Sequence, residues 1–97
     1  MKLYILEDEP RILQHLLQVV QTISFIEVVG TSAEVAKALK EIPEFKPDMI
    51  LADIRLKDGD SFQLFDEIGT DDFQVIFLTA YDQYAIQALN MGAFGYL

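Results

Sequence analysis

Residues 49–53 read Met-Ile-Leu-Ala-Asp, an unbroken apolar run that changes abruptly to a carboxylate. A strand that is apolar at successive positions, rather than at alternate ones, is expected to be covered on both faces, as in a parallel sheet. A short apolar run that ends in a charged residue is typical of a buried strand that stops at a functional edge. The stretch therefore predicts an α/β fold with Asp53 at the end of a strand.

Apolar segments that favour strands also lie on both sides of this stretch. The first breaks into Glu7-Asp8-Glu9-Pro10, the second leads to Gly30, and a later one ends at Thr79. The strands are expected at residues 3–6, 25–29, 49–52, 75–78 and 93–97.

Between the expected strands, apolar residues recur at the spacing of amphipathic helices. Pro10 suits the first turn of a helix that runs to about Ser24. Thr31 or Ser32 offers a capping side chain for a second helix, which is expected to end at the loop 43–47 because prolines stand at both of its ends.

The second half of the chain continues the alternation. Residues 57–60 read Lys-Asp-Gly-Asp and predict a turn, after which Ser61 is expected to cap a third helix that stops at Gly69. A fourth helix holds Tyr84 and Leu89 and runs to Gly92. Strict alternation of strands and helices predicts a doubly wound parallel five-stranded sheet with right-handed crossovers.

The composition indicates how many domains the protein has, which partners it avoids and where it is located. The 97 residues are expected to form one domain, residues 1–97. A net charge of −9, from 16 acidic and 7 basic residues, disfavours direct contact with nucleic acid. The chain contains no Cys and no apolar run near the roughly 18 residues of a membrane span, so we expect a cytoplasmic protein without membrane contact.

The four expected helices cannot cover both faces of the sheet evenly. We infer that the domain is incomplete at its C-terminal end and lacks a fifth, final helix, which would leave an apolar strip on the sheet. An uncovered face beside a terminal edge strand favours a homodimer or exchange of the C-terminal segment between copies.

Ligands of an open parallel sheet bind at the carboxyl ends of the strands. In this chain those ends carry Glu7-Asp8, Asp53 and Thr79. If the first and third strands are neighbours, three carboxylates converge, and their repulsion favours a bound cation. Because all the available ligands are oxygens, Mg²⁺ is expected rather than zinc. Asp53, alone at its strand end, is the better nucleophile for a phosphoryl group, and Thr79 could donate its hydroxyl to that group.

Several motifs occur in a characteristic order along the whole chain. They are Glu7-Asp8-Glu9-Pro10, Pro47-Asp48 before the 49–53 strand, Asp58-Gly59, Thr79-Ala80-Tyr81-Asp82 and Gly92-Ala93-Phe94-Gly95-Tyr96-Leu97. Together they resemble the receiver domains of two-component signalling. The resemblance implies a flavodoxin-like sheet with strand order 2-1-3-4-5.

The resemblance also implies roles for individual residues. Asp53 looks like the phospho-acceptor, and Glu7 and Asp8 look like the acidic pair that binds Mg²⁺ together with it. Arg55 would contribute its backbone carbonyl to the metal.

Thr79 and Tyr96 look like the switch pair, whose hydroxyl moves toward the phosphoryl group while the aromatic ring turns inward. The implied partners are a sensor histidine kinase and a C-terminal effector domain that is not present in this chain. The run Thr79–Asp82 is similar to that of regulators with a LytTR-type DNA-binding effector, which points to transcriptional regulation. Such a domain is not an enzyme, although it assists its own phosphorylation and dephosphorylation.

The sequence departs from the family pattern at two places. Lys57 stands where the family commonly has Pro, and the family's Lys, usually followed by Pro, would lie two residues beyond Leu97. Without that Lys no cation from the last strand can pair with Asp53 or with its acyl phosphate, so the resemblance alone does not establish phosphorylation or its coupling to the switch. The alternative function is therefore a receiver-like interaction module whose output does not depend on phosphorylation.

Other site types fit less well. The motif of haloacid-dehalogenase-type phosphatases has a second Asp two residues after the nucleophile, and this chain has Arg55 at that position. A calcium loop over residues 53–60 would need oxygen ligands at Arg55 and Lys57. A nucleotide site would need a Gly-rich turn after the first strand, where Glu-Asp-Glu-Pro occurs instead.

Overall fold

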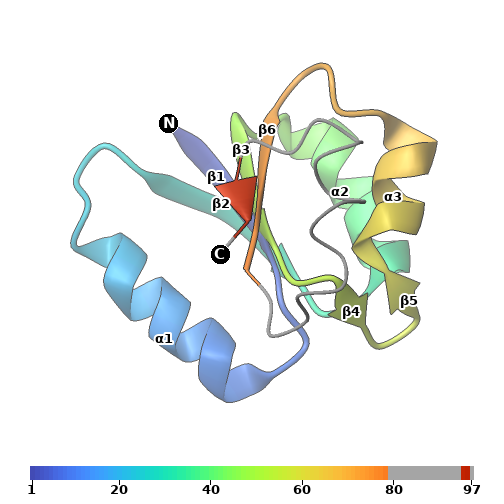
Figure 1. Cartoon of the computed structure of the whole chain (residues 1–97). Helices are drawn as coiled ribbons and strands as arrows, with labels where there is room; N and C mark the ends of the chain where they lie inside the picture. The colour runs from blue at the N-terminus through green and yellow to red at the C-terminus, as the bar shows by residue number, and fades with distance from the viewer. Residues whose placement is uncertain (79–94, 97) are drawn as a thin grey trace.

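From β1 to β6 a helix separates each strand of the main sheet from the next, as Figure 1 shows. The computed structural model describes residues 1–78 and the backbone of residues 95–96. The strands are β1 (Lys2–Leu6), β2 (Glu27–Ser32), β3 (Met49–Ala52), β4 (Arg55–Leu56), β5 (Gly59–Asp60), β6 (Gln74–Phe77) and β7 (Gly95–Tyr96). The helices within the described residues are α1 (Pro10–Gln21), α2 (Val35–Phe45) and α3 (Ser61–Ile68).

The main sheet is parallel and has the strand order β2-β1-β3-β6-β7. This is the predicted order 2-1-3-4-5, which is therefore confirmed. Leu6 of β1 is paired with Ala52 of β3, and Ala52 is paired with Phe77 of β6. Because these strands end level with one another, the residues that follow them lie side by side.

Helices cover both faces of the sheet (Figure 1). Tyr4 and Leu6 belong to the core that β1 shares with α2 and α3, whereas Leu3 and Ile5 pack with Val20 of α1. All four of these β1 side chains are buried. The successive apolar residues of β1 are thus explained by burial on both sides, and the doubly wound architecture is confirmed.

The predicted boundaries of the first helix and second strand were wrong by several residues. Helix α1 ends at Gln21 because the N–H of Thr22 bonds to the carbonyls of Val19 and Val20. A further turn follows, in which the N–H of Ile26 bonds to the carbonyl of Ile23, and β2 begins only at Glu27. These local turns separate the helix from the strand.

Helix α2 also differs from the prediction, because it continues through Pro43 to Phe45. A proline in the last turn removes only one backbone donor, and the N–H of Lys46 still bonds to the carbonyl of Ile42. The helix ends where Lys46 adopts the left-handed conformation, with φ 50°, just before Pro47.

The third helix is capped by Asp60 rather than by Ser61. The Asp60 side chain accepts from the N–H of Gln63, whose side chain accepts from the N–H of Asp60, so the two residues form a capping box. Ser61 is the first helical residue, and its hydroxyl donates to the carbonyl of Asp53. The expected turn at residues 57–60 is the tip of a short hairpin formed by β4 and β5. The fourth helix, expected near Tyr84–Gly92, lies outside the described residues.

Gly30 leaves no room for a larger side chain. It is paired with Tyr4 beside a bulge in β2, and a Cβ at Gly30 would lie 2.7 Å from Cε2 of Tyr4 and 3.0 Å from Cε2 of Phe45. Because the Tyr4 ring is fully buried, it can move away only by displacing the core around it, and we expect Gly30→Ala to lower the free energy of unfolding by about 1–3 kcal/mol. Urea denaturation measures this change, and an unaltered midpoint would show that the two rings can repack.

Candidate functional site

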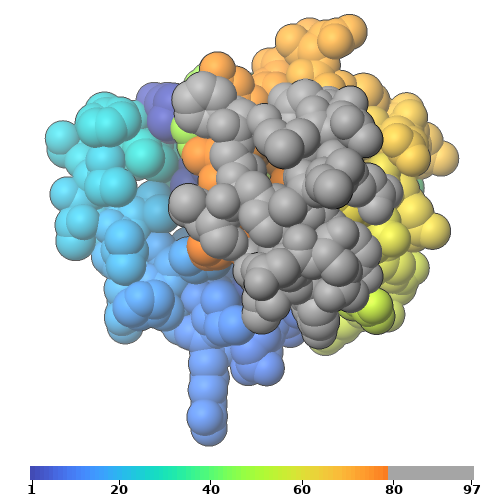
Figure 2. All heavy atoms as spheres, viewed as in Figure 1, coloured from blue at the N-terminus to red at the C-terminus, as the bar shows by residue number. Residues whose placement is uncertain are grey.

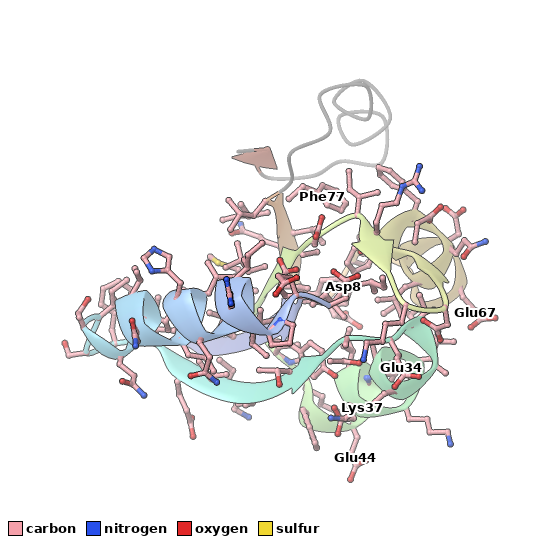
Figure 3. The ribbon with its side chains drawn as sticks, turned by 90° about the horizontal axis from the view of Figure 1, so that it is seen from below. Asp8, Glu34, Lys37, Glu44, Glu67 and Phe77 are labelled. Carbon is pink, nitrogen blue, oxygen red and sulfur yellow. The ribbon has the colours of Figure 1, made fainter. Side chains whose placement is uncertain are left out.

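Three carboxylates converge at the carboxyl ends of β1 and β3. Glu7 and Asp8 follow β1, and Asp53 follows β3. Each offers an oxygen, and these oxygens all lie within 4.8 Å of one another. Figure 3 shows Asp8 among the strand ends, near the end of β6 that bears Phe77. The predicted meeting of the three side chains is therefore observed.

Backbone hydrogen bonds extend the sheet up to these residues. The N–H of Asp53 bonds to the carbonyl of Leu6 at 2.8 Å, and the N–H of Glu7 bonds to the carbonyl of Ser32 at 2.9 Å. Oδ1 of Asp53 accepts from the N–H of Ile54 at 2.7 Å. The backbones of Glu7 and Asp53 are thus held by the ends of the strands, which suits a preorganised site.

The acidic cluster is electrostatically costly. Glu7 is buried, with an exposed fraction of 3%, whereas Asp8 and Asp53 are half-buried and reach solvent. Burial raises the pKa of Glu7 to about 7, and the negative charges of Asp53 and Asp8 contribute to the rise, although a hydrogen bond from the N–H of Glu9 opposes it. A cation at this place would relieve the repulsion.

The donor set fits a hard divalent cation. All three side chains offer oxygens, which Mg²⁺ prefers, and the described residues bring no His or Cys to the cluster. Glu7, Asp8 and Asp53 are therefore the residues that could hold Mg²⁺.

The raised pKa of Glu7 predicts a pH dependence of stability in the metal-free chain. Unfolded Glu7 loses its proton near pH 4.5, but folded Glu7 keeps it until about pH 7, so the unfolded state binds fewer protons in this interval. Stability is expected to fall as pH rises through the interval, by on the order of 3 kcal/mol.

Chemical denaturation in EDTA at a series of pH values measures this loss. Glu7→Gln should remove the Glu7 contribution, whereas Glu9→Gln, a change at the exposed neighbour, should keep it. The same slope in the Glu7→Gln variant and the unmodified chain would contradict the prediction.

The other residues singled out from the sequence are placed less completely. Arg55 is exposed and begins β4, two positions after Asp53. Thr79 lies outside the described residues. Tyr96 belongs to β7, where its backbone is paired with Phe77 at the edge of the sheet.

Sequence reasoning missed the part played by Asp58. This residue was expected only in a turn, but its two carboxylate oxygens accept from the N–H groups of Val35 and Ala36 at the start of α2. Its partners are 23 and 22 residues away in the sequence. The Asp-Gly pair at 58–59 signals the turn but not these distant partners.

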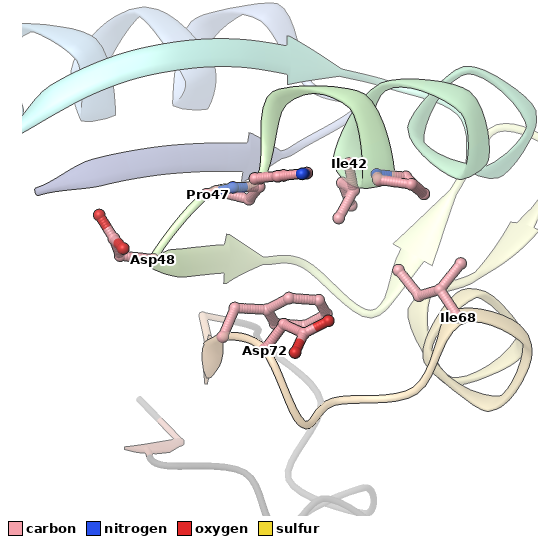
Figure 4. A pocket seen from close by; sticks show the side chains of 8 residues that line it. Ile42, Pro47, Asp48, Ile68 and Asp72 are labelled. Atoms are coloured by element: carbon pink, nitrogen blue, oxygen red, sulfur yellow. The ribbon is translucent and has the colours of Figure 1, made fainter.

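A separate hollow of about 420 Å³ lies at the opposite end of the sheet (Figure 4). Ile42 and Ile68 line it on the helix side, and Pro47, Asp48 and Asp72 line it near the starts of β3 and β6. Since the carboxylate cluster lies at the carboxyl ends of β1 and β3, whereas the hollow lies at the start of β3, the hollow is not part of the candidate metal site.

Comparison with known proteins identifies the family to which this fold belongs. Residues 3–97 match the family described as the response regulator receiver domain. The chain belongs to this family. Receiver domains are phospho-acceptor signalling modules of two-component systems, and the predicted family membership is confirmed.

Individual relatives support the same assignment of this receiver domain. An uncharacterized response regulatory protein of Vibrio vulnificus is 37% identical over 94 residues, which are 96% of this chain and 39% of that protein. The sensory transduction protein LytT of Bacillus anthracis is 30% identical over 99 residues, covering 100% of this chain and 40% of LytT. The receiver domain therefore spans about 40% of the length of these curated relatives.

A solved structure is similar throughout the chain. The response regulatory domain of protein mrkE from Klebsiella pneumoniae superposes with a TM-score of 0.92 at 31% identity, covering 100% of this chain and 81% of that one. Among the described helices of the receiver domain, none has the length and apolar character needed to cross a membrane.

Proposed function

We propose that this receiver domain accepts a phosphoryl group on Asp53 from a sensor histidine kinase, in a reaction that requires Mg²⁺. An oxygen of Asp53 attacks the phosphorus of a phosphohistidine, the phosphorus–nitrogen bond breaks, and its electron pair stays on the histidine. Asp53 then carries an acyl phosphate. Bound Mg²⁺ would neutralise charge on the phosphoryl oxygens during the transfer.

The convergence of the carboxylates is the observation that carries this proposal. An oxygen of Asp53 lies within 4.8 Å of an oxygen of Glu7 and of Asp8. Because Asp53 is only partly buried, a substrate can approach it from solvent. Glu7, Asp8 and Asp53, together with the backbone carbonyl of Arg55, would hold the ion. Asp53 is thus a nucleophile placed beside its own metal site.

The output of the domain belongs to the same proposal. Thr79 and Tyr96 would respond to the acyl phosphate as the switch pair. Similarity to LytT, together with the run Thr79–Asp82, supports a longer cytoplasmic regulator whose effector domain is of the LytTR type and controls transcription.

Phosphoryl labelling tests the proposal. The chain is incubated with acetyl phosphate or phosphoramidate, with Mg²⁺ or with EDTA, and its intact mass is measured. We expect one phosphoryl group per chain with Mg²⁺ and none with EDTA. Absence of label in both conditions would overturn the proposal and favour an interaction module that works without phosphorylation.

Docking of the kinase would involve the exposed apolar end of α1. Ile12 is 46% exposed. Helix α1 lies away from α2 and α3 in Figure 1, and its atoms form part of the molecular surface in Figure 2. We expect Ile12→Asp to slow phosphoryl transfer from the cognate kinase by about 10-fold, because a charge would replace an apolar contact. Labelling by acetyl phosphate should not change, because it needs no docking.

A second variant controls for the added charge. Gln14→Asp introduces the same group at an exposed position of α1 and should leave kinase transfer unaltered. Equal rates for Ile12→Asp and the unmodified domain would place the docking surface elsewhere.

A further inference from the structure

Asp58 caps a helix to which it does not belong. The residue at the N-cap of α2, Glu34, makes no capping hydrogen bond with its side chain. Instead, Oδ1 of Asp58 accepts from the N–H of Val35 at 2.6 Å, and Oδ2 accepts from the N–H of Ala36 at 3.0 Å. The bonds from Ala36 and Val35 lower the pKa of Asp58, so its carboxylate stays charged at neutral pH beside the positive end of the helix.

The cap anchors the tip of the hairpin formed by β4 and β5. Asp58 lies at this tip, between the paired residues Leu56 and Gly59, and the neighbouring N–H of Lys57 bonds to the carbonyl of Ala33 at 3.1 Å. Figure 3 shows the start of α2, marked by Glu34, beside the hairpin. Three hydrogen bonds thus attach the tip to α2 and the turn before it.

The other end of the hairpin is joined to the acidic cluster. Arg55 comes two residues after Asp53 and is paired with Asp60. The N–H of Ser61 bonds to the carbonyl of Ile54 at 2.8 Å, and the Ser61 hydroxyl donates to the carbonyl of Asp53. A movement of the tip would therefore be transmitted to the backbone of residues 53–55.

We propose that Asp58 is a positioning residue of the metal site, which holds the 55–60 hairpin on α2 so that the Arg55 carbonyl is fixed for Mg²⁺. This inference rests on the proposed function, because it assumes that the ion binds beside Glu7, Asp8 and Asp53. The link also operates in the opposite direction. An ion that fixes the hairpin at the site would also strengthen the cap of α2, because coupling between two equilibria is reciprocal.

Calorimetric titration with MgCl₂ tests the positioning role. Asp58→Ala removes both acceptor oxygens and is expected to raise the Kd for Mg²⁺ about 10-fold, as loss of an outer support of a metal ligand does. Asp58→Asn keeps one acceptor oxygen and should give an intermediate Kd.

Tyr4→Phe is the matched control, because it removes a different hydrogen bond that holds α2. In this bond the Tyr4 hydroxyl donates to Oε1 of Glu41 at 2.7 Å. The control should lose some stability but keep the Kd of the unmodified chain.

Hydrogen exchange gives a second measurement. If Asp58 only capped α2 and were not coupled to the metal site, Mg²⁺ would not change the exchange rates at the start of α2. Mg²⁺ should slow exchange of the Val35 and Ala36 amides in the unmodified chain and in Tyr4→Phe, but not in Asp58→Ala. If the unmodified chain binds Mg²⁺ and Asp58→Ala binds it equally well, the positioning role is wrong while the proposed function stands. If the unmodified chain binds no Mg²⁺, the proposed function and this inference both fail.

Discussion

Asp53→Asn is expected to abolish phosphoryl labelling while leaving the fold intact. The amide has nearly the shape of the carboxylate, and its oxygen can still accept from the N–H of Ile54, as Oδ1 of Asp53 does at 2.7 Å. However, an amide oxygen is too weak a nucleophile to form the acyl phosphate. The change also removes one of the negative charges that raise the pKa of Glu7, so stability without metal should not fall.

Intact mass after incubation with acetyl phosphate and Mg²⁺ measures this loss. Asp66→Asn provides the control, because Asp66 is an exposed Asp on α3 and its replacement should leave the label complete. Far-ultraviolet circular dichroism establishes that both variants are folded. A label that survives in Asp53→Asn would mean that another residue is the acceptor.

The acidic cluster was predictable from local sequence because it follows from the ends of two strands. The apolar runs 3–6 and 49–52 each stop at a carboxylate, and pairing of Leu6 with Ala52 brings those ends together. To predict the cluster, the only long-range information needed is that β1 and β3 are neighbours in the sheet. Burial of Glu7 beside two half-buried partners, in contrast, depends on the packed surroundings and could not be obtained from the pattern.

The helix boundaries were less predictable because tertiary contacts override local preference. Pro43 was expected to end α2, but Ile42 is buried in the core and the Phe45 ring lies 6.5 Å from the Tyr4 ring, measured between centroids. These contacts stabilise the last turn despite the missing N–H of the proline. Likewise, the cap provided by Asp58 connects residues more than 20 positions apart, which no local motif encodes.

The double variant Glu7→Gln/Asp8→Asn is expected to weaken Mg²⁺ binding by about 100-fold or more, because affinity for a hard cation depends on the number of charged oxygen ligands. Two of the three clustered carboxylates are removed, and Asp53 alone remains. Calorimetric titration with MgCl₂ measures the change. Glu9→Gln is the matched control, because Glu9 adjoins the pair but lies outside the cluster, and its Gln substitute can still accept from the N–H of Arg11.

The double variant's change in stability without metal distinguishes a metal-binding role of Glu7 and Asp8 from a structural role. If Glu7 and Asp8 served mainly to hold the strand ends, their replacement would lower stability in EDTA. We expect the reverse at pH 8, because the folded chain must otherwise keep the buried carboxylate of Glu7 ionised beside Asp53. A gain in metal-free stability together with loss of Mg²⁺ binding would mark residues retained for function at a cost in stability. Loss of stability with unaltered Mg²⁺ binding would place the ion elsewhere.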